Sequence, residues 1–238
     1  MGTHAVERAH RLRLHVPAAA RAQLSWLAAG LAVGFLVPFV FADRLELPRD
    51  LYYAVHIGAV LAFVALWARR TGQDLPALAR RRVPLTLALG LAAAGVLALV
   101  VLSTEDATAR PDGLELVAAV LWRGVAYGAA DGLLLSVFPI LAVFALFAGT
   151  RARRGVAGTL AVGLAALAAS LAMTAVYHLG YAEFRSEQVR QPLAGDVVWS
   201  APTLLTLNPV GAPVAHAGMH VAAVLHSYET DVFLPPHE

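Results

Sequence analysis

The sequence contains no cysteine and no lysine, and only 14% of its 238 residues are charged. The absence of cysteine excludes disulfide bonds, thiolate metal sites and cysteine nucleophiles. A soluble domain usually carries about 25% charged residues, so most of this chain is unsuited to a water-exposed surface. The basic side chains are all arginines divided among short loops, and this dispersion argues against nucleic-acid binding.

Long uncharged runs lie between the arginine clusters. Twelve of the 18 arginines fall in three stretches, namely the first 21 residues, residues 69–82 and residues 151–154. Apolar runs of about 20 residues are long enough to cross a bilayer as helices, and arginine-rich loops stay on the cytoplasmic side. The sequence therefore predicts a multi-pass protein of the cell membrane, surrounded by the lipid bilayer, with its N-terminus and both arginine-rich loops in the cytoplasm.

We expect an all-α helical bundle of about six transmembrane spans, the last one broken, forming a single domain over residues 24–226. A basic cytoplasmic segment of residues 1–23 precedes this domain, and a short polar tail of residues 227–238 follows it. The first apolar run is too long for the apolar part of a signal peptide, so we expect it to be a span. The runs are about Leu24–Ala42, Leu51–Ala68, Val83–Leu102, Leu114–Gly149, Val156–Leu179 and Val197–His226.

Two of these runs are not simple spans. Residues 114–149 are too long for one straight crossing, yet they join an acidic loop to a basic one, so we expect a tilted or broken helix that crosses once. In the last run, the segment Asn208–Pro213 contains two prolines and a glycine, which break a helix. Non-helical backbone cannot face lipid, so this break should be buried. The segment then either crosses, leaving the tail inside, or forms a re-entrant hairpin with the tail outside, and we favour the crossing.

Ionisable side chains within spans are costly and usually face a protein interior or a cavity. His56, Arg123 and His178 lie at similar depths near the outer ends of three predicted helices. This convergence predicts an outward-facing polar pocket built from Arg123, His178, His216 and His220, in which Arg123 and His178 approach each other. The leading functional hypothesis is binding or assembly at this pocket, with a membrane-protein partner as one occupant.

His216 and His220 are four residues apart, which places both imidazoles on one face of a helix, as a pair of metal ligands requires. They are the candidate ligands of a divalent metal, and the enzyme alternative is a histidine-metal hydrolase or intramembrane protease with Arg123, His178 and His216 as candidate catalytic residues. A structural alternative is that each histidine hydrogen-bonds a neighbouring backbone or hydroxyl group. A b-haem between facing helices is a further alternative, with His56 and His178 as candidate cofactor ligands.

The charges at positions 123 and 131 need partners. Arg123 either snorkels to the outer interface or meets Asn208 or a carbonyl group of the break. Asp131 lies deeper, where a proton or ion role competes with a structural hydrogen bond. The positive end of the helix that follows the break disfavours a metal ion there unless Asp131 lines the same pocket. The outer aromatic belt of the membrane is the expected place of three further residues, Tyr177, Tyr181 and Trp199.

Three short motifs, in order along the chain, resemble those of the CPBP family of intramembrane proteases, which process CAAX proteins and bacteriocins. Residues Ala118–Gly124 are similar to a motif of two adjacent glutamates, an apolar gap and Arg-Gly. Residues Val176–Leu179 are similar to the second motif, an aromatic residue and a histidine. Residues Ala215–His220 are similar to the third motif, a histidine followed four residues later by Asn or Asp.

The chain departs from this family pattern at its functional positions. Ala118 and Ala119 stand where the family has its paired glutamates, and Glu115 is the only carboxylate nearby. Thr174 replaces a phenylalanine of the second motif, and His220 replaces the Asn or Asp of the third. Because the glutamates would supply the base that activates water, the resemblance implies a non-proteolytic relative of these proteases.

Overall fold

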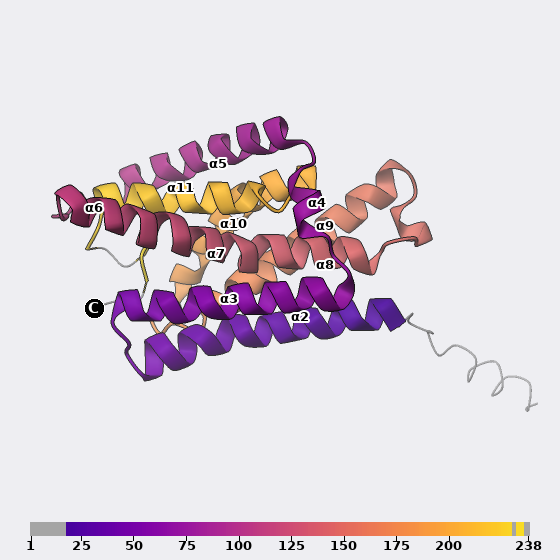
Figure 1. Cartoon of the computed structure of the whole chain (residues 1–238), viewed down its shortest axis with the longest axis horizontal. Helices are drawn as coiled ribbons and strands as arrows, with labels where there is room; N and C mark the ends of the chain where they lie inside the picture. Colours follow the sequence, from indigo (N-terminus) through magenta and orange to yellow (C-terminus); the bar gives the residue numbers. More distant parts are fainter. Residues whose placement is uncertain (1–17, 230–231, 236–238) are drawn as a thin grey trace, which may run out of the picture.

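The computed structural model describes residues 18–229 and 232–235. Residues 1–17 and the remaining tail residues lie outside this range, so the predictions for the basic N-terminal segment and the end of the tail are not addressed by it. All regular elements of the described residues are helices (Figure 1), which confirms the expectation of an all-α bundle. The elements are α2 (Ala18–Val37), η1 (Pro38–Arg44), α3 (Arg49–Thr71), α4 (Leu75–Ala79), α5 (Val83–Thr104), α6 (Gly113–Ala119), η2 (Val120–Tyr127), α7 (Gly128–Gly132), η3 (Leu133–Val137), α8 (Phe138–Leu146), η4 (Arg151–Arg153), α9 (Gly155–His178), η5 (Glu187–Val189), α10 (Arg190–Thr206) and α11 (Gly211–His226).

Within the described residues, five helical runs are long and apolar enough to cross a membrane. They coincide with the first five predicted spans. Their outward-facing side chains are apolar, as lipid-facing positions should be; Leu99 of α5 and Leu164 of α9, for example, are 66% and 69% exposed. The five runs are Ala18–Arg44, Arg49–Thr71, Val83–Thr104, Gly113–Leu146 and Gly155–His178.

The fourth of these runs, α6 to α8, is the central helix of the bundle. It is continuous rather than broken, and two stretches with wide π-type turns, η2 and η3, interrupt its α-helical geometry. At a rise of about 1.5 Å per residue, its 34 residues extend for roughly 50 Å. This length exceeds the hydrocarbon thickness of about 30 Å, so a single crossing requires a tilt or projection beyond the membrane.

The last apolar run forms a hairpin of two antiparallel helices, α10 and α11. The turn between them lies beside the arginine-rich loop of residues 69–82, where the Asn208 side-chain amide donates to the carbonyl groups of Ala79 (3.0 Å) and Arg81 (2.6 Å). At the other end of α11, the carbonyl oxygen of His226 accepts a hydrogen bond from the Thr108 amide (2.9 Å). Asn208 is only 1% exposed, which confirms that the break is buried.

The hairpin returns the tail to the end of the bundle that holds the loops predicted to lie outside. Arg49 donates to the backbone carbonyl of Tyr228 (3.3 Å), so the tail contacts the start of α3. The favoured prediction of a single crossing with the tail inside is therefore wrong, and the hairpin alternative describes the fold. Figure 1 shows the start of α2 and both arginine-rich loops together at the opposite end. Which end faces the cytoplasm stays a prediction.

A stripe of glycines lets α11 pack closely against the central helix. Gly124, Gly128 and Gly132 are four residues apart and face α11. A Cβ atom added at Gly128 would lie 2.8 Å from the Cα atom of Ala217, and one added at Gly132 would lie 2.7 Å from the Cα atom of Pro213. Small residues at this spacing allow helix backbones to approach within a membrane. The other side of α11 packs against α5, so α11 is enclosed between two longer helices.

Candidate metal centre

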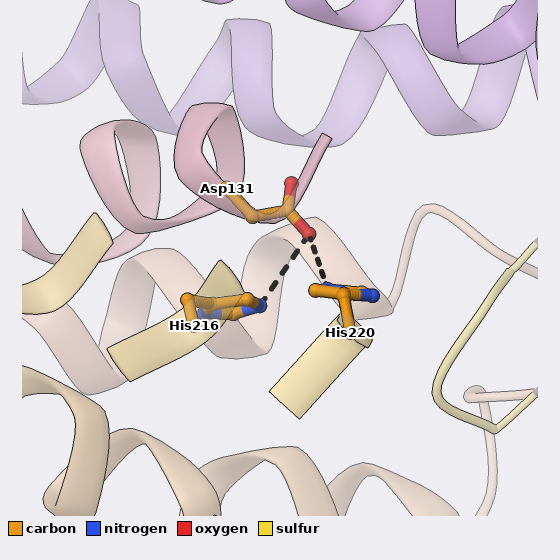
Figure 2. A group of neighbouring side chains, drawn as sticks. All are labelled: Asp131, His216 and His220. Atoms are coloured by element: carbon orange, nitrogen blue, oxygen red, sulfur yellow. Dashed lines mark ion pairs between the residues drawn. The ribbon is translucent and has the colours of Figure 1, made fainter. Parts of the chain in front are cut away.

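Three histidines from two helices surround the carboxylate of Asp131. The Nε2 atom of His56, on α3, lies 2.8 Å from Asp131 Oδ1. The Nε2 atoms of His216 and His220, on α11, each lie 3.6 Å from Asp131 Oδ2. All four residues are at most 3% exposed. Figure 2 shows the Asp131 carboxylate directed from the central helix toward the two imidazoles of α11.

The local sequence explains why these groups meet. The four-residue spacing of His216 and His220 stacks their rings on one face of α11, with centroids 4.9 Å apart. The missing side chain of Gly128 allows this face to approach the central helix, since a Cβ atom there would lie 2.9 Å from His220 Cδ2. Asp131 follows Gly128 by about one helical turn. The glycine stripe therefore brings the carboxylate and both imidazoles to the same point.

These buried polar atoms have few partners within the part of the chain that is described. Both ring nitrogens of His220 and the Nδ1 atom of His216 make no hydrogen bond, whereas Asp131 Oδ1 is already in contact with His56 Nε2 at 2.8 Å. Leaving one buried polar atom without a hydrogen bond costs about 1–3 kcal/mol. The structural alternative, in which His216 and His220 each hydrogen-bond a nearby backbone or hydroxyl group, is therefore not what the structure contains. The cluster has an unused capacity for a ligand.

The geometry of Asp131, His216 and His220 suits a metal ion. One potential ligand atom from each residue lies within 4.8 Å of the other two. Bonds of about 2.0–2.2 Å in a tetrahedral zinc site place two ligand atoms roughly 3.3–3.6 Å apart, and both histidines lie 3.6 Å from the carboxylate oxygen. The sequence disfavoured a metal ion at the positive end of this helix unless Asp131 lined the same pocket, and Asp131 does line it. His56 contacts the other carboxylate oxygen, where it orients the carboxylate.

A cavity of about 210 Å³ adjoins the cluster in the half of the bundle nearer the tail. Asp131, His178, His216 and His220 contribute its polar wall, and most other lining residues are apolar. Part of the tail closes one side of the cavity through three lining residues, Val232, Phe233 and Pro235. The cavity gives the cluster a space in which a small or partly inserted apolar molecule could meet the polar groups.

His178 is oriented by its own helix. Its Nδ1 atom lies 2.8 Å from the carbonyl oxygen of Thr174. A carbonyl oxygen only accepts hydrogen bonds, so Nδ1 carries the ring proton and Nε2 holds the lone pair of the neutral imidazole. Because His178 lines the cavity, it is the base available beside the three candidate ligands.

Arg123 lies outside this cavity, contrary to the sequence prediction. Its Nε and Nη2 atoms donate to the two carboxylate oxygens of Asp50, at 2.9 and 2.8 Å. Its guanidinium carbon also lies 4.8 Å from the ring centroid of Tyr228 in the tail. Arg123 does not line the cavity that His178 lines, so the predicted shared pocket is not formed, and Asn208 lies at the opposite end of the bundle. Arg123 instead joins α3, the central helix and the tail.

Four tyrosine hydroxyl groups form a buried chain beside the cluster. The Tyr52 and Tyr181 hydroxyls are 2.5 Å apart, Tyr177 and Tyr181 are 2.7 Å apart, and Tyr127 and Tyr177 are 2.6 Å apart. Burial raises the pKa of Tyr181 well above its usual value of 10. Tyr177, Tyr181 and Trp199 are at most 2% exposed, so their expected place in a lipid-facing aromatic belt is wrong. They are core residues.

The sequence left the role of Asp131 open and assigned His56 only to a possible haem. The signal that would have joined them to His216 and His220 is the four-residue glycine spacing before Asp131, which marks the face of the central helix that meets another helix. No protein-family model, no curated protein and no solved structure matches this chain.

Proposed function

We propose that this chain is a membrane-embedded hydrolase that uses one divalent metal ion, with zinc as the best match to its ligands. Asp131, His216 and His220 hold the ion, and His56 orients the Asp131 carboxylate. The observation that carries this proposal is a group of buried, under-bonded ligand atoms that border a cavity. Three protein ligands with one open position are the arrangement of catalytic zinc sites, whereas structural sites use four protein ligands.

The residues around the cavity supply the remaining parts of a hydrolytic reaction. A bound zinc ion would supply a Lewis acid and would lower the pKa of a water molecule to near 7. The Nε2 lone pair of His178 would accept a proton from the attacking water, whose oxygen would bond to the substrate carbonyl carbon while the bond from this carbon to the leaving oxygen or nitrogen breaks. His178 would then return the proton to the leaving group, so that water is added across the cleaved bond. His216 and His220, which both lie on α11, would fix the position of the ion.

The lining of the cavity indicates the class of substrate. Apart from its histidines and Asp131, the cavity is bounded mainly by apolar groups such as Val96, Leu97 and Phe233. A molecule that dissolves in the membrane and carries one polar, cleavable bond matches this combination. We therefore propose an ester or amide of an apolar, membrane-resident compound as the substrate.

The other readings of the sequence receive less support from the geometry. A haem between His56 and His178 would need space beside His56, but the His56 ring packs 5.3 Å from the ring of Tyr127 and 5.4 Å from that of Tyr177. The CPBP-like glutamate positions are alanines, and Asp131 follows Ala119 by more than three helical turns. The proposed chemistry therefore centres on Asp131 rather than on the position used by that family.

The test begins with the metal content of the protein purified in detergent. We expect about one zinc ion per chain, as three ligands and one cavity require. His216→Ala, His220→Ala and Asp131→Asn should each lose the ion. His226→Ala is the matched control, because His226 lies on the same helix but contacts the carbonyl oxygen of Glu105 instead of the cluster. This control should retain the ion.

Activity separates the metal site from the hydrolysis. We expect the protein to cleave fluorogenic long-chain acyl esters, to lose this activity on chelation and to recover it with zinc. His178→Ala should retain zinc and lose the activity. A stable protein that binds no divalent metal would overturn the whole proposal. A protein that binds zinc but cleaves neither acyl esters nor acyl amides would overturn the hydrolase assignment while leaving the metal centre in place.

A further inference from the structure

The cavity beside the metal centre opens sideways, between α5 and α10. Val96 and Val100 of α5 line the cavity and are nevertheless 50% and 37% exposed. On α10, the lining residue Ala194 is exposed and the lining residue Val198 is half-buried. Side chains that border a cavity and also reach the surface of the protein lie at its mouth. The mouth of this cavity is therefore formed by α5 and α10.

The other sides of the cavity are closed. The tail covers the side toward the loops, where Phe233 and Pro235 line the cavity and are buried. At the opposite end of the bundle α5 and α10 are in contact, because Arg82 donates to the backbone carbonyl of Leu205 (3.4 Å). The mouth therefore lies in the half of the bundle nearer the tail and faces away from the bundle axis.

The mouth lies along the apolar part of the two helices. Val96 is eight residues before the end of α5 at Thr104, and Val198 is eight residues after the start of α10 at Arg190. At a rise of about 1.5 Å per residue, both residues lie roughly 12 Å from the end of the bundle where the tail lies. One half of the hydrocarbon layer is about 15 Å thick. The mouth therefore faces the acyl chains of a single leaflet, which we call the tail-side leaflet.

The polarity of the lining changes along the cavity. The lining residue Gln191 is polar and exposed at the start of α10, at the level of the lipid headgroups. The side chains at the mouth are apolar, and the imidazoles and the Asp131 carboxylate are buried behind them. Pockets that enclose a drug-sized molecule measure roughly 300–1,000 Å³, whereas this cavity has about 210 Å³. It therefore has room for only a part of a lipid molecule.

We propose that this mouth binds the acyl chain of a lipid that enters sideways from the tail-side leaflet. The carbonyl end of the chain reaches the histidines, and the rest of the chain stays between α5 and α10 and in the bilayer. Lipid tails are as apolar as leucine side chains, so the chain enters without losing hydration, whereas a charged, water-soluble molecule would lose its hydration at the mouth. Cleavage of the bound lipid rests on the proposed function, but its binding requires no metal.

The test follows the fluorescence of Trp199, which is buried and lines the cavity, in protein stripped of metal by a chelator. The full chain, with Trp26, Trp67 and Trp122 replaced by phenylalanine, is placed in phosphatidylcholine vesicles with or without bromine on the acyl chains. Bromine quenches tryptophan at short range, so we expect brominated lipid to quench Trp199 although this residue is buried. If this variant does not fold, the difference between the unchanged protein and Trp199→Phe gives the same signal.

Substitutions that fill the mouth provide the comparison. Val96→Phe and Ala194→Phe should remove most of the quenching of Trp199. Leu99→Phe and Val197→Phe are the matched controls, because they change exposed residues of the same two helices outside the cavity lining, and they should leave the quenching unchanged. A Trp199 signal without quenching, or equal quenching in the filling and control variants, would overturn the lipid site.

Ester cleavage separates this site from the proposed hydrolysis. In the protein with zinc, the filling variants should retain the ion and lose cleavage of long-chain acyl esters in vesicles, while the control variants keep both. Quenching of Trp199 in a protein that cleaves no ester would support the lipid site and overturn the hydrolase assignment alone. Filling variants that cleave esters as fast as the unchanged protein would show that the substrate arrives from the water past the tail, and this result would overturn sideways entry.

Discussion

The glycine stripe should control metal affinity without supplying a ligand. In Gly128→Ala, the new Cβ atom would lie 2.8 Å from Ala217 Cα and 2.9 Å from His220 Cδ2, while ordinary contact begins at 3.4 Å. Because Ala217 Cα is backbone, α11 has to move away by at least about 0.6 Å. His220 Nε2 already lies 3.6 Å from Asp131 Oδ2, and further separation exceeds the roughly 3.3–3.6 Å that one zinc ion spans. We expect metal affinity to fall about 10- to 100-fold, as it does when the support of a ligand is lost.

Stability should change less than affinity. Overpacking costs about 1–3 kcal/mol, and replacing a helical glycine by alanine returns up to about 1 kcal/mol through helix propensity. A net loss of about 1 kcal/mol corresponds to a decrease of roughly 2–4 °C in the unfolding midpoint of a chain of this size. The assay combines thermal unfolding of the metal-free protein with a zinc titration against a competing chelator.

Gly95→Ala is the control for this substitution, because a Cβ atom at Gly95 meets nothing within 4 Å. It should keep the zinc affinity of the unchanged protein. Gly124→Ala provides a second comparison, since its Cβ atom would meet Val221 rather than the histidine pair; it should lower stability with a smaller effect on zinc. Equal zinc affinities for Gly128→Ala and Gly95→Ala would refute the argument that close packing of α11 forms the site.

Two further predictions concern sidedness and the Arg123 pair. The chain has no cysteine, so Thr71→Cys and Asp106→Cys each introduce a single site for a thiol label. In intact cells, a membrane-impermeant maleimide should label the cysteine at position 106 and not the one at position 71. The reverse pattern would contradict the orientation predicted from the arginines. Asp50→Asn should lower stability by about 1–2 kcal/mol and more than Arg123→Met does, because the Asp50 side chain is 55% exposed while that of Arg123 is 10% exposed. Denaturation measurements check this order, and altered zinc affinity in either variant would contradict the placement of Arg123 outside the metal centre.

Much of the fold could be predicted from the sequence, because each of the longer spans is identified by its own apolar run and the charged loops beside it. Five apolar runs between arginine-rich and acidic loops predicted five helices whose ends agree within three residues, except that the first helix begins at Ala18 rather than at Leu24. The α10–α11 hairpin was read as one broken crossing because each helix is short and carries polar groups such as Asp196 and His216. The polar side chains of α10 and α11 face neighbouring helices. Their burial therefore depends on tertiary contacts, which the hydropathy of the sequence does not show.

The histidine pair of the candidate site could be predicted from the sequence, but the residues that meet this pair could not. The spacing of His216 and His220 follows from helical geometry alone. Asp131 meets them only because α11 packs against the glycine face of the central helix, about 85 residues earlier in the chain. Arg123 pairs with Asp50, which lies at the start of another helix. The packing of whole helices determines which of these distant residues come into contact, so the sequence alone does not identify the partners.

The hairpin described above has a consequence for the biogenesis of the protein. Helices α10 and α11 have 17 and 16 residues, and an aspartate at the centre of an isolated span opposes insertion by about 2.5–3.5 kcal/mol. These two helices are therefore expected to enter the membrane as a pair, into the space left by the five longer helices that the ribosome has already delivered. Asp131 and His56 are in place before His216 and His220 arrive. The proposed metal ion would accordingly bind late, because a nascent chain released before α11 would carry the Asp131 carboxylate without the imidazoles of His216 and His220.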